Sequence, residues 1–110
     1  MAVDIFLKLD NIKGESVDDK YQDETDITQW SWGMSQSGTT HLGPGGGSGK
    51  VNVQDLTLTK YVDMATHDLL KHCASGTHIA EGELIVRKAG ATPLEYMKIK
   101  MTDIIVSSYS

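Results

Sequence analysis

The 110-residue sequence predicts a mainly β protein, an antiparallel two-sheet sandwich or β-barrel with one flanking α-helix. Apolar and polar residues alternate with a period of two over most of the chain, which is typical of half-buried strands. Only one stretch, at about 66–75, combines helical apolar spacing with helix end signals. Glycine-rich and acidic segments separate these stretches and indicate turns and loops.

The first strand is predicted at residues 2–9, AVDIFLKL, where only Phe6 breaks the alternation. An acidic loop should follow at residues 10–24. Its carboxylates suggest Ca²⁺, but the twelve-residue loop with a terminal Glu that a calcium site needs is absent. A solvated loop is the better interpretation.

The second strand is predicted at residues 25–36, TDITQWSWGMSQ. Trp30 and Trp32 share one face with Met34, and we expect both indole rings in the core, because each buries on the order of 200 Å². The opposite face carries small side chains: Ser31, Gly33 and Ser35.

A glycine-rich loop at residues 37–50, ending in GPGGGSGK, suggests a phosphate-binding loop. The motif requires a glycine where Pro44 stands, and a Ser or Thr where Val51 stands. It also requires a helix after the lysine, whereas residues 50–60 alternate as a strand with a bulge at 54–55. The pattern favours a flexible loop over a nucleotide site.

The predicted helix at 66–75 begins at Thr66, a good N-cap residue. Leu69 and Cys73 lie on its apolar stripe, and Gly76 allows the left-handed residue that ends a helix. Two strands close the chain, one ending near residue 89 and one from 94, joined by a GATP turn. Beyond Thr102 the alternation changes phase, as at a bend.

Composition limits the function further. A net charge of −5 with scattered Lys and Arg argues against a nucleic-acid partner. No apolar run is long enough to insert into a membrane, and the N-terminus does not resemble a signal peptide. One cysteine excludes an internal disulfide. The length fits one domain, residues 1–110.

We expect no catalytic, metal or cofactor site. The histidines invite a metal interpretation together with Cys73, but their spacing matches no zinc motif. These histidines are His41, His67, His72 and His78. No ordered nucleophile signature accompanies the Ser, His and Asp residues either.

Several motifs, in order, resemble the Hcp family, the tube protein of type VI secretion systems (haemolysin-coregulated protein). They are GES at 14–16, WSWGMSQSG at 30–38, GGGSGKVNVQDLTLTKYVDMATHDLL at 45–70, CASG at 73–76, VRKAG at 86–90 and DIIVSS at 103–108. The resemblance covers nearly the whole chain.

The resemblance implies a structural protein, not an enzyme. Hcp-like proteins form a two-sheet β-barrel with a helix on its side and assemble into homohexameric rings. The rings stack into a tube that lies inside a contractile sheath, carries a spike protein and holds effector proteins in its lumen. Such a subunit would assemble in the cytoplasm and be secreted without a signal peptide. The family continues past the C-terminal motif, so we expect the barrel of this chain to be incomplete there.

The resemblance also suggests roles for two surfaces. The glycine-rich loop would dock on the next ring, and its candidate stacking residues are His41, Leu42, Gly45, Gly46, Gly47 and Lys50. The small face of Ser31, Gly33 and Ser35 would line the lumen or meet a neighbouring subunit, or be an ordinary solvated face. Two other functions stay open: a small β-rich nucleotide-binding or enzymatic domain that uses the glycine-rich loop, and a soluble ring that carries effectors as a chaperone does.

Overall fold

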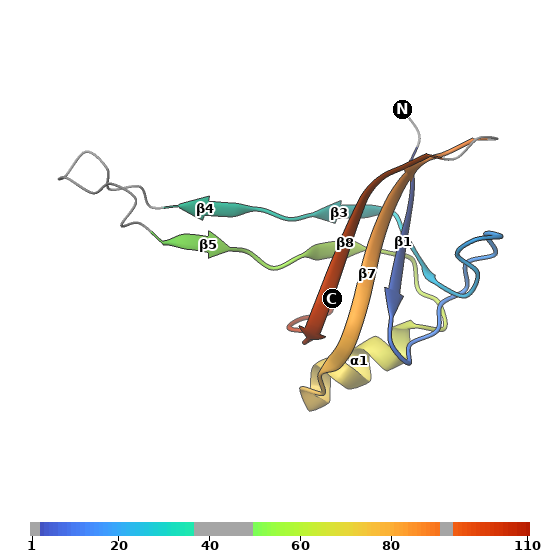
Figure 1. Ribbon diagram of the computed structural model, residues 1–110. Helices are drawn as coiled ribbons and strands as arrows, with labels where there is room; N and C mark the ends of the chain where they lie inside the picture. The colour runs from blue at the N-terminus through green and yellow to red at the C-terminus, as the bar shows by residue number, and fades with distance from the viewer. Residues whose placement is uncertain (1–2, 37–49, 91–93) are drawn as a thin grey trace, which may run out of the picture. The chain divides into compact units, whose positions relative to one another are not determined.

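A computed structural model of the chain describes residues 3–36, 50–90 and 94–110 (Figure 1). The contacts divide the chain into two compact units. The first unit combines residues 1–29 with 60–110, and the second is residues 30–59. The single-domain organisation stays a prediction.

The first unit is built on a four-stranded sheet. Its strands are β1 (Val3–Leu9), β2 (Thr25–Ile27), β7 (Ile79–Lys88) and β8 (Leu94–Ile104). Their order is β2-β1-β7-β8, and every neighbouring pair is antiparallel. The three long strands lie side by side in Figure 1. Segments far apart in the sequence therefore meet in the centre of the sheet, where β1 pairs with β7 along the whole length of β1.

The centre of this sheet is buried on both faces. Leu7 lies opposite Leu84 on one face, and both side chains are buried. Phe6 lies opposite Ile85 on the other face, where Tyr21 of the acidic loop stacks on the Phe6 ring at a centroid distance of 4.9 Å. Phe6 therefore breaks the alternation because the second face of the sheet carries a small core of its own.

Helix α1 (Thr66–Ser75) has the predicted bounds but a different start. Its N-cap is Ala65, and no side chain caps it there. Instead, the Thr66 hydroxyl accepts a hydrogen bond from the Asp63 N–H at 3.1 Å, and the Asp63 carboxylate accepts one from the Ala65 N–H at 3.0 Å. The prediction that Thr66 is the N-cap was therefore wrong: the helix begins one residue earlier, and the Asp63 carboxylate accepts the hydrogen bond from the Ala65 N–H. Gly76 ends the helix with φ 68°, as predicted.

The second unit contains two short ladders. One pairs β3 (Gln29–Ser31) with β6 (Thr57–Thr59), and the other pairs β4 (Met34–Gln36) with β5 (Val51–Val53). The strands predicted at 25–36 and 50–60 are thus interrupted. The Trp32 indole N–H donates to the Gln54 carbonyl at 2.8 Å, and the Gln54 N–H donates to the Gly33 carbonyl at 3.0 Å, so these bonds replace the ladder at the interruptions.

The predicted fold class is confirmed: antiparallel sheets dominate and one helix accompanies them. Within the described residues the sheets do not close into a barrel. No helix in this part of the chain is both long and apolar enough to cross a membrane.

Candidate assembly surfaces

Arg87 organises the charged side of the first unit. It lies on β7, its side chain is buried, and it pairs with Asp4 of β1 at 3.2 Å and with Asp18 of the acidic loop. Its guanidinium carbon lies 4.9 Å from the centre of the Phe6 ring and 5.5 Å from that of Tyr21. Arg87 therefore joins the acidic loop to the sheet through charge and ring contacts together.

The ionisation of these groups follows from their contacts. The hydrogen bond from Arg87 lowers the pKa of Asp18, and the same bond raises the pKa of Arg87. Two residues further along the loop, the Lys20 ammonium donates to Glu95 of β8 at 2.7 Å and lowers the pKa of that carboxyl. Both contacts favour the charged forms and hold the loop in place at neutral pH.

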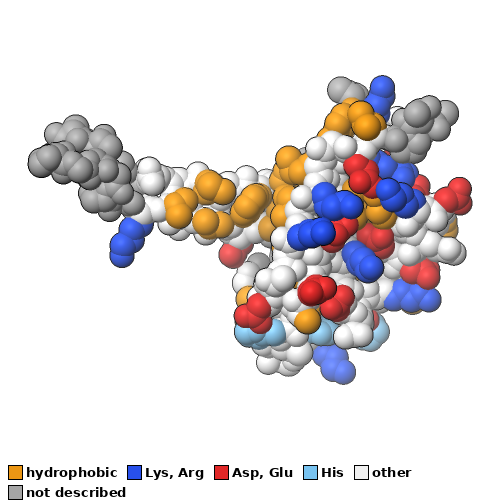
Figure 2. Space-filling view, viewed as in Figure 1, with side chains coloured by type: hydrophobic (Ala, Val, Ile, Leu, Met, Phe, Trp, Pro, Cys, Tyr) orange, Lys and Arg blue, Asp and Glu red, His pale blue; other side chains and the backbone are white. Residues whose placement is uncertain are grey.

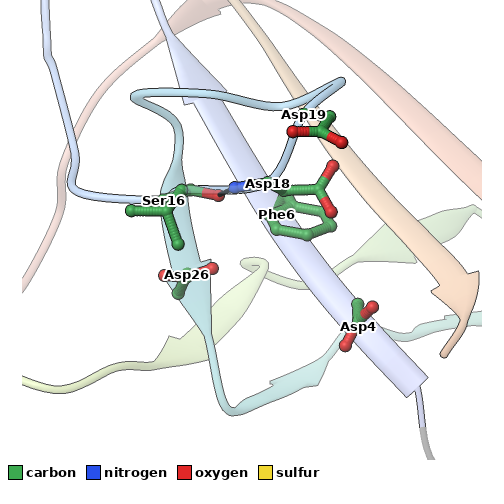
Figure 3. A pocket seen from close by; sticks show the side chains of 7 residues that line it. Asp4, Phe6, Ser16, Asp18, Asp19 and Asp26 are labelled. Atoms are coloured by element: carbon green, nitrogen blue, oxygen red, sulfur yellow. Dashed lines mark hydrogen bonds between the residues drawn. The ribbon is translucent and has the colours of Figure 1, made fainter. Parts of the chain in front are cut away.

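A shallow hollow of about 410 Å³ lies beside the acidic loop (Figure 3). Its lining consists of Asp4, Phe6, Ser16, Val17, Asp18, Asp19 and Asp26. Asp4 and Asp18 are engaged by Arg87. Burial raises the pKa of Asp26, and the neighbouring carboxylates of Asp63, Asp4 and Asp18 add to that effect. The hollow is therefore an acidic surface, with its negative charge extending to β2.

Metal binding finds no support in the described ranges, where no three His, Cys, Asp or Glu side chains are placed to hold one ion. The residues after Lys50 form strand β5, as the alternation predicted. A phosphate loop needs a helix at this point, so the local structure disagrees with that motif.

The β4–β5 ladder presents an exposed apolar face. Met34 lies directly opposite Val53, and the two side chains are 58% and 54% exposed. Val51 continues this face opposite Gln36. Figure 2 shows hydrophobic side chains gathered along this part of the second unit. Isolated two-stranded ladders are marginal in water, so an apolar face on one indicates a contact surface.

The predicted small polar face lies on the other side of this ladder. Ser35 is exposed and lies opposite Asn52, on the face away from Met34 and Val53. Ser31 is exposed and Gly33 is half-buried. Their role in a lumen or a subunit interface stays a prediction. Of the predicted stacking residues, Lys50 is exposed just before β5, and His41, Leu42, Gly45, Gly46 and Gly47 lie outside the described residues.

The four predicted core residues divide into three groups. Leu69 is buried, and Trp30 and Cys73 are half-buried. Trp32 is 44% exposed, which differs from the expected core position. Its indole N–H is held by the Gln54 carbonyl, so the ring lies along the ladder instead of entering a core.

Sequence reasoning missed two features of the first unit. Arg87 directly follows the apolar run LIV of a predicted strand. A buried arginine needs acidic partners, so this position could have predicted an ion pair with the acidic loop. The edge strands of the sheet could not be predicted from the sequence, because the alternation of apolar and polar residues does not reveal strand order.

These features define a small antiparallel β protein whose distinctive surfaces are strand edges, an exposed apolar ladder and an acidic patch. Such surfaces suit association with other chains. The chain belongs to the family described as type VI secretion system effector, Hcp, whose family model matches residues 6–110.

Known relatives agree with this membership. The chain is 51% identical over 111 residues to Protein hcp1 of Pseudomonas aeruginosa, and the match covers 100% of this chain and 68% of the relative. It is similar to the crystal structure of Hcp1 from Salmonella typhimurium, with a TM-score of 0.76, 42% identity and coverage of 96% and 64% of the two chains. A structure of a type six secretion system protein gives a TM-score of 0.91 at 30% identity, with coverage of 99% and 68%.

The chain thus spans about two thirds of the length of these relatives. The identification made from the motifs is confirmed. The comparisons support a secretion tube protein, and nothing in them supports the nucleotide-binding alternative.

Proposed function

We propose that this chain is a ring-forming structural subunit of the inner tube of a type VI secretion system and performs no reaction. The observation that carries the proposal is the match to the Hcp family over residues 6–110. The exposed face of Met34 and Val53 supports it, because an apolar ladder in water favours contact with other chains.

The partners follow from this role. Copies of the chain form the six-membered ring that the family resemblance implies, and rings stack into a tube. The glycine-rich loop at 37–50 contacts the next ring, and the face of Ser31, Gly33 and Ser35 lines the lumen or a subunit boundary. The tube lies within the contractile sheath, carries the spike protein and holds effectors. The subunit assembles in the cytoplasm and leaves the cell through the machine.

The assembly state tests this proposal. Light scattering and native mass spectrometry of the purified chain should show a species of six times the monomer mass, and electron microscopy should show rings and short tubes. A monomer at every concentration would contradict the proposal. Protection of a co-purified effector from proteolysis would test the lumen separately. Calorimetry with ATP and Mg²⁺ should give no binding heat, and a saturable signal would revive the nucleotide alternative.

A further inference from the structure

The acidic loop, residues 10–24, folds back on itself beside the sheet of the first unit. The Ser16 N–H donates to the Glu24 carbonyl at 2.9 Å, and the Asp23 N–H donates to the Ser16 carbonyl at 2.9 Å. Two limbs of the loop are therefore paired with each other, and residues 17–22 form the tip between them.

One carboxylate both folds the tip and binds it to the sheet. Asp18 accepts hydrogen bonds from the backbone N–H groups of Lys20 and Tyr21, at 3.1 and 3.2 Å. The same carboxylate forms an ion pair with Arg87 of β7. The internal hydrogen bonds of the tip and its contact with the sheet therefore share one side chain.

Two further contacts hold the tip over the sheet. The buried Tyr21 ring stacks on Phe6 of β1, and the Lys20 ammonium donates to Glu95 of β8 at 2.7 Å. A register shift in the β7–β8 pairing places Glu95 opposite Arg87, and residues that lie opposite one another share a face of the sheet. The tip is therefore bound to β1, β7 and β8 on one face.

The base of the loop contacts the start of helix α1 instead. The Glu15 carboxylate accepts a hydrogen bond from the Met64 N–H at 2.7 Å. Met64 directly precedes the N-cap Ala65, whose own N–H donates to the Asp63 carboxylate. Carboxylates stabilise the N-terminal end of a helix. Glu15 therefore supports the start of α1 from a distant part of the chain.

The two contacts are joined by a short buried link. Glu15 and Asp18 are separated only by Ser16 and Val17, and Ser16 is 2% exposed. The Ser16 hydroxyl accepts a hydrogen bond from the Asp18 N–H at 3.2 Å, and its backbone is paired with the other limb of the loop. Because this link is short and hydrogen-bonded, displacing one contact also displaces the other.

We infer that the acidic loop is a strap that opens and closes as one unit with the first turn of α1, held closed by Arg87 at its tip and by Glu15 at its base. Segments whose hydrogen bonds depend on one another open together in folded proteins. A disturbance at the tip, where Val17 is 92% exposed, therefore reaches the helix. The inference concerns a single chain and does not rest on the proposed ring.

Hydrogen exchange of the full chain, measured by mass spectrometry of its peptide fragments, tests the strap. Arg87→Met removes the contact at the tip and should raise the exchange rate of residues 62–69, at the helix, by about fivefold or more. Glu15→Ala removes the contact at the base and should raise the rate of residues 17–22 by a similar factor. A single opening predicts both effects, because each variant is read at the end of the strap that it does not touch.

Matched variants control for local effects. Lys88→Met changes the exposed neighbour of Arg87, and Asp19→Ala removes an exposed carboxylate at the tip. Both should change the exchange rate at the helix by less than about twofold, as surface changes usually do. Glu15→Gln keeps an oxygen that accepts the Met64 N–H and should restore most of the protection at the tip. Native mass spectrometry checks that all variants are compared in one assembly state.

Three outcomes would overturn the strap. In the first, exchange rises only beside the altered residue, so that the two contacts open separately. In the second, the control variants raise exchange at the helix as strongly as Arg87→Met. In the third, exchange rises equally at residues 5–7 in the centre of the sheet, which indicates general loosening of the fold. If Arg87→Met does not fold, Glu15→Ala decides the question alone. None of these outcomes bears on the ring, whose test is the assembled mass.

Discussion

At the scale of single residues, Arg87 makes ion pairs with two segments of the chain and also packs against an aromatic ring. It is 7% exposed and lies near the end of β7, where an unpaired charge would be costly. Asp4 and Asp18 balance the charge from two other segments, and the Phe6 ring covers the guanidinium face. The ion pair therefore specifies how the acidic loop sits on the sheet.

Replacing Arg87 should expose this dependence. Arg87→Met is expected to lower the free energy of unfolding at pH 7, because it removes the cation that pairs with Asp4 and Asp18. The lowered pKa of Asp18 means that its contribution is present above its ordinary value of 3.8 and is lost as the pH falls through the folded-state pKa. The difference between variant and wild type should therefore shrink below about pH 3.8.

Urea unfolding from pH 7 to pH 2.5 measures both effects. Lys88→Met, an exposed neighbour on the same strand, is the matched control. Equal stabilities of the two variants at pH 7, or a difference that does not change with pH, would count against the role given to Arg87.

At the scale of elements, the motif GES at 14–16 shows how a glycine positions the acidic loop. The Gly14 N–H donates to the Asp23 carbonyl at 2.7 Å, and the Ser16 N–H donates to the Glu24 carbonyl at 2.9 Å. A Cβ atom at Gly14 would lie 2.5 Å from the Glu24 carbonyl oxygen. The two segments of the loop therefore approach each other too closely for any side chain at this position.

Gly14→Ala should accordingly destabilise the first unit by about 1–3 kcal/mol, since the obstructing atoms are backbone and cannot move aside. Thermal unfolding followed by circular dichroism measures the change. Gly33→Ala is the control, because a Cβ there meets nothing within 4 Å, and surface changes of this kind usually cost less than about 0.5 kcal/mol. A Gly14 variant as stable as the control would show that the loop can open.

The sequence predicted individual elements better than their connections. β1 and α1 were found because local alternation, apolar spacing and Gly76 are sufficient signals. The strand predicted at 25–36 is instead three short strands, because β2 pairs with β1 whereas β3 pairs with β6, and because bonds around Trp32 separate β3 from β4. The period of the apolar residues shows which face of a strand a residue occupies, but it does not show where other hydrogen bonds replace those of the ladder.

At the scale of the whole molecule, the candidate surfaces depend on pairings between distant segments. The small polar face around Ser35 was predictable from alternation alone. The cross-strand row of Asp26, Phe6, Ile85 and Lys98 was not, because it requires the order β2-β1-β7-β8 and the register of three pairings. Motifs identified the family, whereas only the fold shows which distant segments are neighbours in the sheet.

The exposed ladder of the second unit gives the last prediction. If its apolar face contacts another ring, Met34→Lys with Val53→Lys should shorten tubes strongly while leaving the mass of a single ring unchanged, because the two lysines replace apolar contact with like charge. Sedimentation and negative-stain microscopy measure tube length. Val17→Lys, the same kind of change at a 92% exposed position of the acidic loop, is the control and should leave stacking intact. Tubes of normal length in the double-lysine variant would show that this face makes no contact in the assembly, and loss of the ring mass itself would assign it to a contact within the ring.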